Sequence, residues 1–187
     1  LTPLLTAARS ILVVPEAQTG AFLDALKNAH LDSSVIVVPG GRRRQESVQC
    51  GLQALPTEVS IVAVQDAARP LVSQELFRRC VNTARQHGAG IAAAPVTDTI
   101  KIADSNGMIL STPERATLWA AQTPQVFRKN LLTAAYARCQ QEKRQVTDDA
   151  QAMEIAGYPV ALVENLDPNP KITRPDDLAM TATLLAK

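Results

Sequence analysis

The sequence is poor in the features that mark nucleic-acid-binding and membrane proteins. Aromatic residues make up 3% of its 187 residues and the formal net charge is +1, whereas a nucleic-acid binder needs a basic surface and often aromatic stacking platforms. No apolar run reaches the ~20 residues of a membrane span, and the N-terminus lacks a basic region followed by a hydrophobic signal core. We therefore expect neither nucleic acid nor membrane as a partner, but a small charged ligand.

The positions of the cysteine and glycine residues argue against a disulfide framework, a zinc site and a glycine-rich triphosphate loop. Cys50, Cys80 and Cys139 are odd in number, far apart and without a Cys-x-x-Cys pair, so neither a disulfide framework nor a zinc site is indicated. This usage fits the reduced cytosol and predicts a cytoplasmic protein. No segment matches the glycine-rich strand-to-helix turn that usually binds a triphosphate.

What the sequence does contain is the pattern of one α/β domain. A chain of 20.0 kDa with 46% hydrophobic residues can bury a sizeable core and is too short for two ordinary domains, so we expect one domain over residues 1–187. Its short apolar runs do not alternate with polar residues, which is typical of parallel strands buried on both faces. We predict three layers with a mostly parallel central sheet. The first half predicts strands at 11–14, 35–38, 59–64 and 91–94 and helices at 18–29, 45–55 and 73–86.

The second half begins with a hairpin signal. Residues 100–103 and 108–110 flank Asp104-Ser105-Asn106-Gly107, and Asn-Gly is a strong turn dipeptide. We predict a β-arm at about 97–120, although a surface hairpin without function explains the pattern equally well. Further on we expect helices at 129–142 and 148–156, a strand at 159–163, and a last helix with Thr173 as its N-cap.

The stretch from Val59 to Pro70 carries the clearest chemical signal. An apolar run there ends in Asp66, Arg69 and Pro70, and ligands of parallel α/β sheets bind just beyond the carboxyl ends of the strands. An anion-binding Arg near a polarising Asp indicates phosphate chemistry. A local ion pair in a loop fixed by proline is the competing explanation.

Other polar residues at strand ends and helix starts are candidates with structural alternatives. Gly40-Gly41 can be a tight turn that needs positive φ. Thr147 can cap the helix that follows it. The run from Arg42 to Arg44 is usually a solvated face.

Six segments, taken in order, resemble the 2-C-methyl-D-erythritol 4-phosphate cytidylyltransferases. They are Gly40 to Val48, Val64 to Pro70, Pro95 to Lys101, Trp119 to Phe127, Thr147 to Ala150 and Lys171 to Leu178. The resemblance covers nearly the whole chain from about residue 12. It implies a Rossmann-like nucleotidyltransferase fold with a protruding β-arm. It also implies an enzyme of isoprenoid precursor synthesis that joins CTP to the sugar-alcohol phosphate and releases pyrophosphate.

Such a reaction needs positive charge more than acid–base residues. A phosphomonoester is mostly dianionic near neutrality, since its second pKa is about 6, so its oxygen can attack the α-phosphate of CTP without a general base. Cations and Mg²⁺ can hold the two anions together and offset the charge that grows on the departing pyrophosphate. We expect Mg²⁺ as cofactor, with its protein ligands unassigned.

The resemblance implies a role for ten residues. Arg115 and Lys171 match the family's two cations that position methylerythritol phosphate for attack. The positions that line the substrate pocket correspond to Asp66, Arg69, Thr99, Thr123 and Thr147, and the nucleotide-binding positions to Gly40, Gly41 and Ser47. The arm that carries Arg115 is exchanged between subunits in this family, which implies a homodimer whose sites are completed across the interface.

The sequence departs from the family pattern at two places. Gln65 stands where the family usually has histidine, and either side chain can donate a hydrogen bond. The family also opens with a strand and a glycine-rich loop carrying an Arg and a Lys, whereas this sequence starts after them, at Leu1. Either the sequence is incomplete or the protein is truncated. We expect the former, because a sheet without its central first strand would leave its neighbours unpaired along a buried edge.

Two other functions stay open from the sequence. A related cytidylyltransferase that acts on another polyol phosphate, such as ribitol 5-phosphate, is the first, because the spacing of the pocket threonines does not identify the alcohol. A catalytically inactive nucleotide-binding or dimerisation module is the second, because the triphosphate loop is absent from the sequence.

Overall fold

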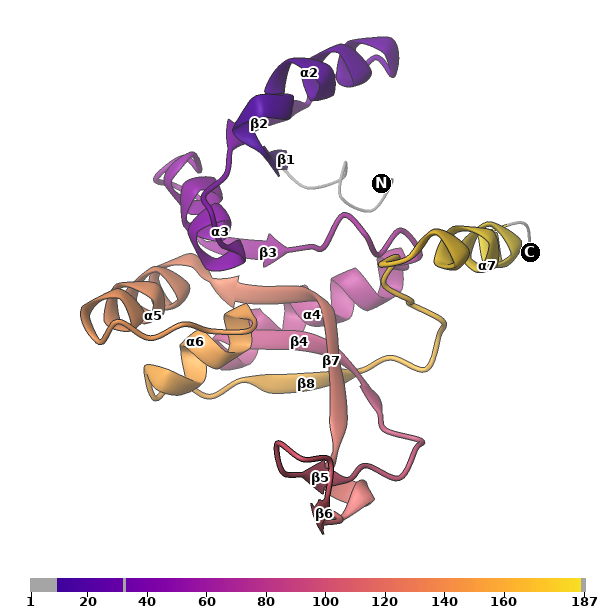
Figure 1. Ribbon diagram of the computed structural model, residues 1–187. Coiled ribbons are helices and arrows are strands. Elements are labelled where there is room, and N and C mark those ends of the chain that lie inside the picture. Colours follow the sequence, from indigo (N-terminus) through magenta and orange to yellow (C-terminus); the bar gives the residue numbers. More distant parts are fainter. Residues whose placement is uncertain (1–9, 32, 186–187) are drawn as a thin grey trace.

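A four-stranded mixed sheet with helices on both faces forms the centre of the molecule (Figure 1). The computed structural model describes residues 10–31 and 33–185, so the start at Leu1, where the sequence departs from the family pattern, lies outside the described residues. The strand order is β3 (Ile61–Val64), β7 (Trp119–Arg128), β4 (Ala89–Pro95) and β8 (Ala161–Glu164). The predicted α/β class is confirmed.

Strand β7 makes the sheet mixed. It runs antiparallel to both neighbours, with Val126 opposite Ala63 of β3 and Gly90 of β4, whereas β4 and β8 are parallel. The expectation of a mostly parallel sheet is therefore not confirmed. The reason is the path of the chain, which leaves the sheet along β4 and returns beside it along β7, as in a long hairpin. The sequence did not reveal β7 as a strand, because Pro124 lies inside it and proline is avoided in central strands.

Two hydrophobic cores cover opposite faces of the sheet. Val126 of β7 belongs to one core with Cys80, and its neighbour Phe127 belongs to the other with Met153. Successive side chains of a strand point to opposite faces, so β7 contributes to both cores. The helices that cover the faces are α4 (Gln74–His87) on one side and α5 (Lys129–Gln141) and α6 (Asp149–Ile155) on the other. This arrangement agrees with the predicted three layers.

The N-terminal part of the described chain is a βαβ unit with its own two-stranded parallel sheet. Its elements are β1 (Ser10–Val14), the short 3-10 helix η1 (Glu16–Gln18), α2 (Thr19–Asn28), β2 (Val35–Pro39) and α3 (Arg44–Gln53). Helix α3 packs against both of these strands and against α5. Helix α3 therefore lies between the two strands of this unit and the α5 side of the central sheet.

The chain segment that connects β4 to β7 forms a hairpin. It consists of β5 (Ile102–Ala103) and β6 (Ile109–Ser111) and is followed by the 3-10 helix η2 (Arg115–Thr117). The Asp104 carboxylate closes its turn by accepting hydrogen bonds from the backbone N–H groups of Asn106 and Met108. Gly107 has a φ of +81°, which suits the Asn-Gly turn expected from the sequence. Figure 1 shows the hairpin beyond the N-terminal end of β7, at the bottom of the view.

The C-terminal helices begin one residue later than their predicted caps imply. Asp148, and not Thr147, caps α6, because the Asp148 carboxylate accepts the backbone N–H of Gln151 at 2.9 Å. The last helix, α7 (Pro175–Leu185), is preceded by a turn in which the Asp177 carboxylate accepts the N–H groups of Thr173 and Arg174. Among the described helices, none is long and apolar enough to cross a membrane.

Candidate active site

Three cations surround the Asp66 carboxylate just beyond the end of β3. Lys171 Nζ lies 3.0 Å from Asp66 Oδ2, Arg69 Nε lies 3.9 Å from the same oxygen, and Arg44 Nη2 lies 3.6 Å from Oδ1. The Asp66 side chain is 18% exposed, so these charges interact more strongly than they would in bulk water. The local Asp66–Arg69 pair considered from the sequence exists, but it is one part of a larger cluster.

Gln65 fastens the loop that carries Asp66 and Arg69. Its Nε2 donates to the backbone oxygens of both residues at 3.1 Å, so it supplies the hydrogen-bond donor expected of the residue in this place. Arg69 Nη1 donates to the backbone oxygen of Asn169 at 2.6 Å. Burial lowers the pKa of Arg69, against the opposing effect of Asp66. Arg69 is thus held by the protein on two sides.

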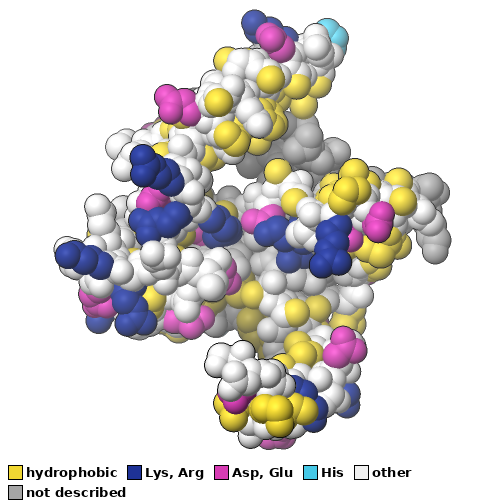
Figure 2. Space-filling view, in the orientation of Figure 1, with side chains coloured by type: hydrophobic (Ala, Val, Ile, Leu, Met, Phe, Trp, Pro, Cys, Tyr) yellow, Lys and Arg dark blue, Asp and Glu magenta, His cyan; other side chains and the backbone are white. Residues whose placement is uncertain are grey.

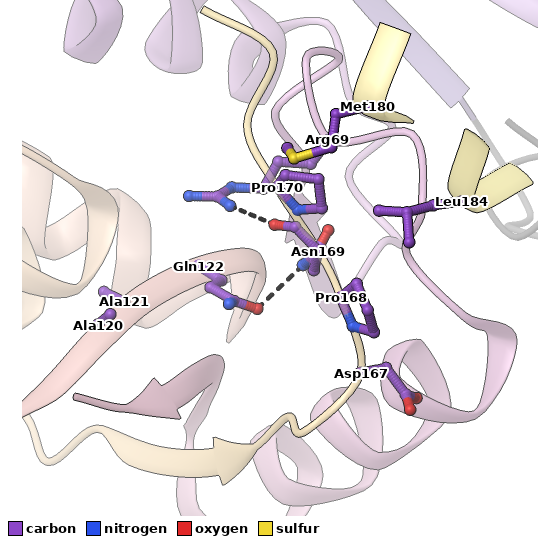
Figure 3. A pocket seen from close by; sticks show the side chains of 10 residues that line it. All are labelled: Arg69, Ala120, Ala121, Gln122, Asp167, Pro168, Asn169, Pro170, Met180 and Leu184. Atoms are coloured by element: carbon purple, nitrogen blue, oxygen red, sulfur yellow. Dashed lines mark hydrogen bonds between the residues drawn. The ribbon is translucent and has the colours of Figure 1, made fainter. Parts of the chain in front are cut away.

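A set of side-chain amides, of which Figure 3 draws Gln122 and Asn169, anchors the loop that leads to Lys171. Asn169 Nδ2 donates to Gln122 Oε1 at 3.1 Å and to the backbone oxygen of Thr123 at 3.0 Å, and Asn165 Nδ2 donates to the same Gln122 oxygen at 2.9 Å. The Lys171 side chain is 44% exposed. The anchored loop backbone therefore presents a side chain that is partly accessible to solvent. These amides belong to no motif in the sequence, and we did not predict them.

Thr123 supports this cluster from inside the protein. Its side-chain oxygen accepts the backbone N–H of Asp66 at 3.1 Å, and the residue is buried. A substrate-lining role was expected from the resemblance, but the contact seen here is with the backbone of Asp66. Thr123 therefore positions the start of the Asp66 loop against β7.

The loop formed by Gly40 and Gly41 is folded tightly against Ser47. The backbone N–H of Gly41 donates to Ser47 Oγ at 3.2 Å, and Ser47 Oγ donates to the backbone oxygen of Arg43 at 3.2 Å. Neither glycine has positive φ, so the turn considered from the sequence is not the reason for them. A Cβ on Gly41 would lie 2.3 Å from Glu46 Cβ, so close approach to α3 excludes a side chain.

Arg44 joins the loop of Gly40 and Gly41 to Asp66 and to α6. We did not predict this role from the sequence, where Arg44 was interpreted as part of a solvated face. Arg44 Nη2 lies 2.7 Å from Asp149 Oδ2, and the Asp149 side chain is fully buried. Tyr136 donates its hydroxyl hydrogen bond to the other Asp149 oxygen. Burial lowers the pKa of Arg44, but the charge and hydrogen bond of Asp149 outweigh this effect and raise the pKa above its usual value. Burial, followed by the charge of Asp149, raises the pKa of Tyr136.

Thr147 lies at the start of α6, two residues before Asp149. Its backbone N–H and its hydroxyl group both bond to Gln151 Oε1, at 2.7 and 3.2 Å. Gln125 of β7 donates to the Asp148 carboxylate at 2.9 Å. The start of α6 is thus tied to the central sheet.

Within a single chain, Arg115 and Thr99 are not part of the charged cluster around Asp66. Both belong to the segment between β4 and β7, and Arg115 Nη1 donates to the backbone oxygen of Thr97 at 3.0 Å. Among the ion pairs of the described residues, none joins Arg115 to an acid. In Figure 2 most of the Lys and Arg side chains of the view gather across the middle of this face, away from the hairpin at the bottom.

A cavity of about 430 Å³ opens beside Arg69, between β7, the loop at 167–170 and α7. Gln122 and Asn169 line it on one side and Met180 and Leu184 on the other (Figure 3). In the described part of the chain no group of three His, Cys, Asp or Glu side chains is placed to hold a metal ion. The site can therefore bind anions through its cations but offers no protein metal cage.

Sequence comparison places this chain beside one family. The family model described as 2-C-methyl-D-erythritol 4-phosphate cytidylyltransferase matches residues 5–187. The protein of that name from Synechococcus is 44% identical over 158 residues, which cover 84% of this chain and 71% of that one. The protein of that name from Bacillus licheniformis is 42% identical over 177 residues, covering 95% and 76%. A bifunctional IspD/IspF enzyme from Desulfotalea psychrophila is 44% identical, and this chain spans 45% of its length.

Solved structures show the same relationship. The crystal structure of a 4-diphosphocytidyl-2C-methyl-D-erythritol synthase from Anaerococcus prevotii is 32% identical with a TM-score of 0.86, covering 96% of this chain and 79% of that one. The structure of a 2-C-methyl-D-erythritol 4-phosphate cytidylyltransferase from Thermus thermophilus is 35% identical with a TM-score of 0.75, covering 82% and 74%.

Proposed function

Because this chain belongs to the 2-C-methyl-D-erythritol 4-phosphate cytidylyltransferase family, we propose that the protein transfers CMP from CTP to 2-C-methyl-D-erythritol 4-phosphate and releases pyrophosphate. The observation that carries this proposal is the group of three cations around Asp66 at the end of β3. A site for two anionic substrates needs such fixed positive charge to bring them together.

The mechanism we propose needs no proton transfer by a side chain. The phosphate dianion of the alcohol attacks the α-phosphate of CTP, one P–O bond forms, and the bond to pyrophosphate breaks. Lys171 and Arg115 hold the attacking phosphate, while Asp66, Arg69, Thr99, Thr123 and Thr147 shape the pocket for the alcohol. Gly40, Gly41 and Ser47 receive the cytosine. The closed loop of Gly41 and Ser47 supports this role, because preformed backbone groups lose little entropy on binding.

We further propose that Mg²⁺ accompanies the triphosphate. The described residues offer no metal cage, and Asp66 already faces cations. Because Mg²⁺ keeps several waters and often binds through substrate phosphates, these residues fit an ion that arrives on CTP. When bound it would offset negative charge on the phosphate oxygens. Activity should then be lost on addition of EDTA and restored by Mg²⁺.

We propose a homodimer built through the hairpin. Met108, Ile109 and Leu110 are 67%, 62% and 66% exposed, and an exposed apolar surface of this kind marks an interaction site. Exchange of the hairpins between subunits would bring Arg115 of one chain to the charged cluster of the other. The separation of Arg115 from that cluster within one chain supports this arrangement.

Mixing two inactive variants tests the exchange. Arg115→Ala and Lys171→Ala homodimers should each be inactive, but a heterodimer would have one intact site of its two. After equal mixing and subunit exchange, about a quarter of wild-type activity should return, because half of the dimers are mixed. Activity that stays at the level of the separate variants would contradict the exchanged hairpin.

The direct test of the reaction compares two alcohols. With CTP and Mg²⁺, the full-length wild-type protein should release pyrophosphate much faster with 2-C-methyl-D-erythritol 4-phosphate than with ribitol 5-phosphate. The opposite preference would favour the related polyol-phosphate enzyme. No product with either alcohol would favour an inactive nucleotide-binding module.

The thiols fit a reducing compartment, and we propose that the enzyme works in the cytoplasm. Cys80 and Cys139 are free and buried. Burial raises the pKa of Cys80 to about 12, so this thiol is inert. Free buried thiols of this kind are typical of proteins that are not disulfide-stabilised.

A further inference from the structure

Arg44 lies between two carboxylates that differ sharply in their surroundings. Its Nη2 is 2.7 Å from the fully buried Asp149 and 3.6 Å from Asp66, which faces the candidate site. The two acids come from distant parts of the chain, at the start of α6 and the end of β3. A single guanidinium thus connects the interior to the site.

On the interior side of this contact, both carboxylate oxygens of Asp149 have a partner. Asp149 is fully buried, and its two oxygens are taken by Arg44 and by the Tyr136 hydroxyl. A buried carboxylate needs such partners, because an unpaired buried charge is strongly destabilising. Asp149 and Tyr136 therefore hold the Arg44 guanidinium in one place, although its side chain is 34% exposed.

The site side of the contact affects Lys171 through Asp66. Asp66 Oδ1 faces Arg44, and Oδ2 faces Lys171 at 3.0 Å. Lys171 must leave part of this ion pair to bind a substrate phosphate, and a nearby carboxylate also repels that phosphate. Arg44 neutralises part of the Asp66 charge, which weakens both effects.

We propose that Arg44 is a positioning residue that offsets the charge of Asp66 and so frees Lys171 for the phosphate of the alcohol. This inference rests on the proposed function. Arg44 itself does not need to contact the substrate. The presence of Arg44 should therefore lower the KM for the polyol phosphate and have little effect on kcat.

The principal test removes the charges of Arg44 and Asp149 together. In Arg44→Gln/Asp149→Asn, Tyr136 keeps an oxygen to which it can donate, so no unpaired charge remains inside. The KM for 2-C-methyl-D-erythritol 4-phosphate should rise about tenfold, with kcat reduced less than about threefold, as expected when a partly buried charge loses its compensating partner. Arg78→Gln, which removes an exposed arginine paired with Glu75 on α4, is the matched control and should behave as wild type.

A second background shows whether Arg44 acts through Asp66. In Asp66→Asn, adding the same two substitutions should change the KM less than about twofold, because no carboxylate is left to offset. Arg44→Lys retains the charge but carries it on a compact, strongly hydrated ammonium at the end of a flexible stem, so its KM should be raised about threefold. If the double variant does not fold, as judged by circular dichroism, Arg44→Lys carries the test alone.

The outcomes separate the two proposals. An active wild type with an unchanged KM in the folded double variant, or in Arg44→Lys if that variant stands alone, overturns the role of Arg44. So does an equal rise in the Asp66→Asn background, or a fall in kcat without a change in KM. A wild type that makes no product with 2-C-methyl-D-erythritol 4-phosphate or ribitol 5-phosphate overturns the proposed function and this inference with it.

Discussion

Replacing Lys171 by alanine should separate catalysis from stability. The Lys171 side chain is 44% exposed and lies 3.0 Å from Asp66, which keeps Arg44 and Arg69 as neighbours after the change. Ion pairs with this exposure contribute about 0–1 kcal/mol. For a chain of this size that corresponds to a fall in Tm of no more than about 4 °C.

The loss of activity should be far larger. A cation that holds the attacking phosphate acts where charge moves in the transition state, and removal of one such preorganised contact lowers turnover by about 10²–10³-fold. The same change in kcat/KM corresponds to about 3–4 kcal/mol of lost transition-state stabilisation. The effect on catalysis thus exceeds the effect on folding severalfold.

Pyrophosphate release with CTP and 2-C-methyl-D-erythritol 4-phosphate measures the activity, and thermal unfolding followed by circular dichroism measures the stability. Lys27→Ala, on the exposed helix α2, is the matched control and should change neither quantity. A fall of less than about tenfold in kcat/KM would refute a direct contact between Lys171 and the substrate. A Tm loss well above the expected range would show that Lys171 mainly supports the fold.

Three further predictions concern α6 and the nucleotide loop. Asp148→Ala should lower the free energy of unfolding in urea by about 1 kcal/mol, because the Asp148 carboxylate caps α6. Thr147→Ala should lower this free energy less, but it should reduce kcat/KM. A larger loss of stability in Thr147→Ala than in Asp148→Ala would contradict both assignments. Gly41→Ala should raise the KM for CTP, because its Cβ would lie 2.3 Å from Glu46 Cβ, and unchanged CTP kinetics would argue against nucleotide binding here. The side-chain hydrogen bond from Arg43 lowers the pKa of Glu46, so its contribution to stability is complete above the ordinary glutamate pKa and is lost as the pH falls through the lowered one. Glu46→Gln should flatten this part of the acid unfolding profile, and an unchanged profile would count against it.

Local signals predicted most of the elements. Ser73 caps α4, because its hydroxyl oxygen accepts the backbone N–H of Leu76 at 3.1 Å, and Gly88 follows the helix with a φ of +94°. Both features depend only on residues within one turn, so the sequence suffices. Thr147 shows the limit of such signals, since the adjacent Asp148 offers an equally suitable oxygen and takes the cap.

The charged cluster was predicted only in part. Asp66 and Arg69 are neighbours in sequence, and the resemblance added Lys171. Arg44 was left out, because nothing local distinguishes it from the two arginines before it. Its partner Asp149 is 105 residues away, and no periodicity reports a contact over that separation.

The amino-acid sequence by itself determined the α/β class, most of the helices and strands, the hairpin turn and the family, since these depend on periodicity, short turns and ordered motifs. Only the tertiary structure decided that β7 runs antiparallel in the middle of the sheet and that Arg44 bridges Asp66 and Asp149. Strand direction follows from where the hairpin returns the chain, and the bridge follows from how α3, α5 and α6 pack. Both are set by contacts between residues far apart in sequence.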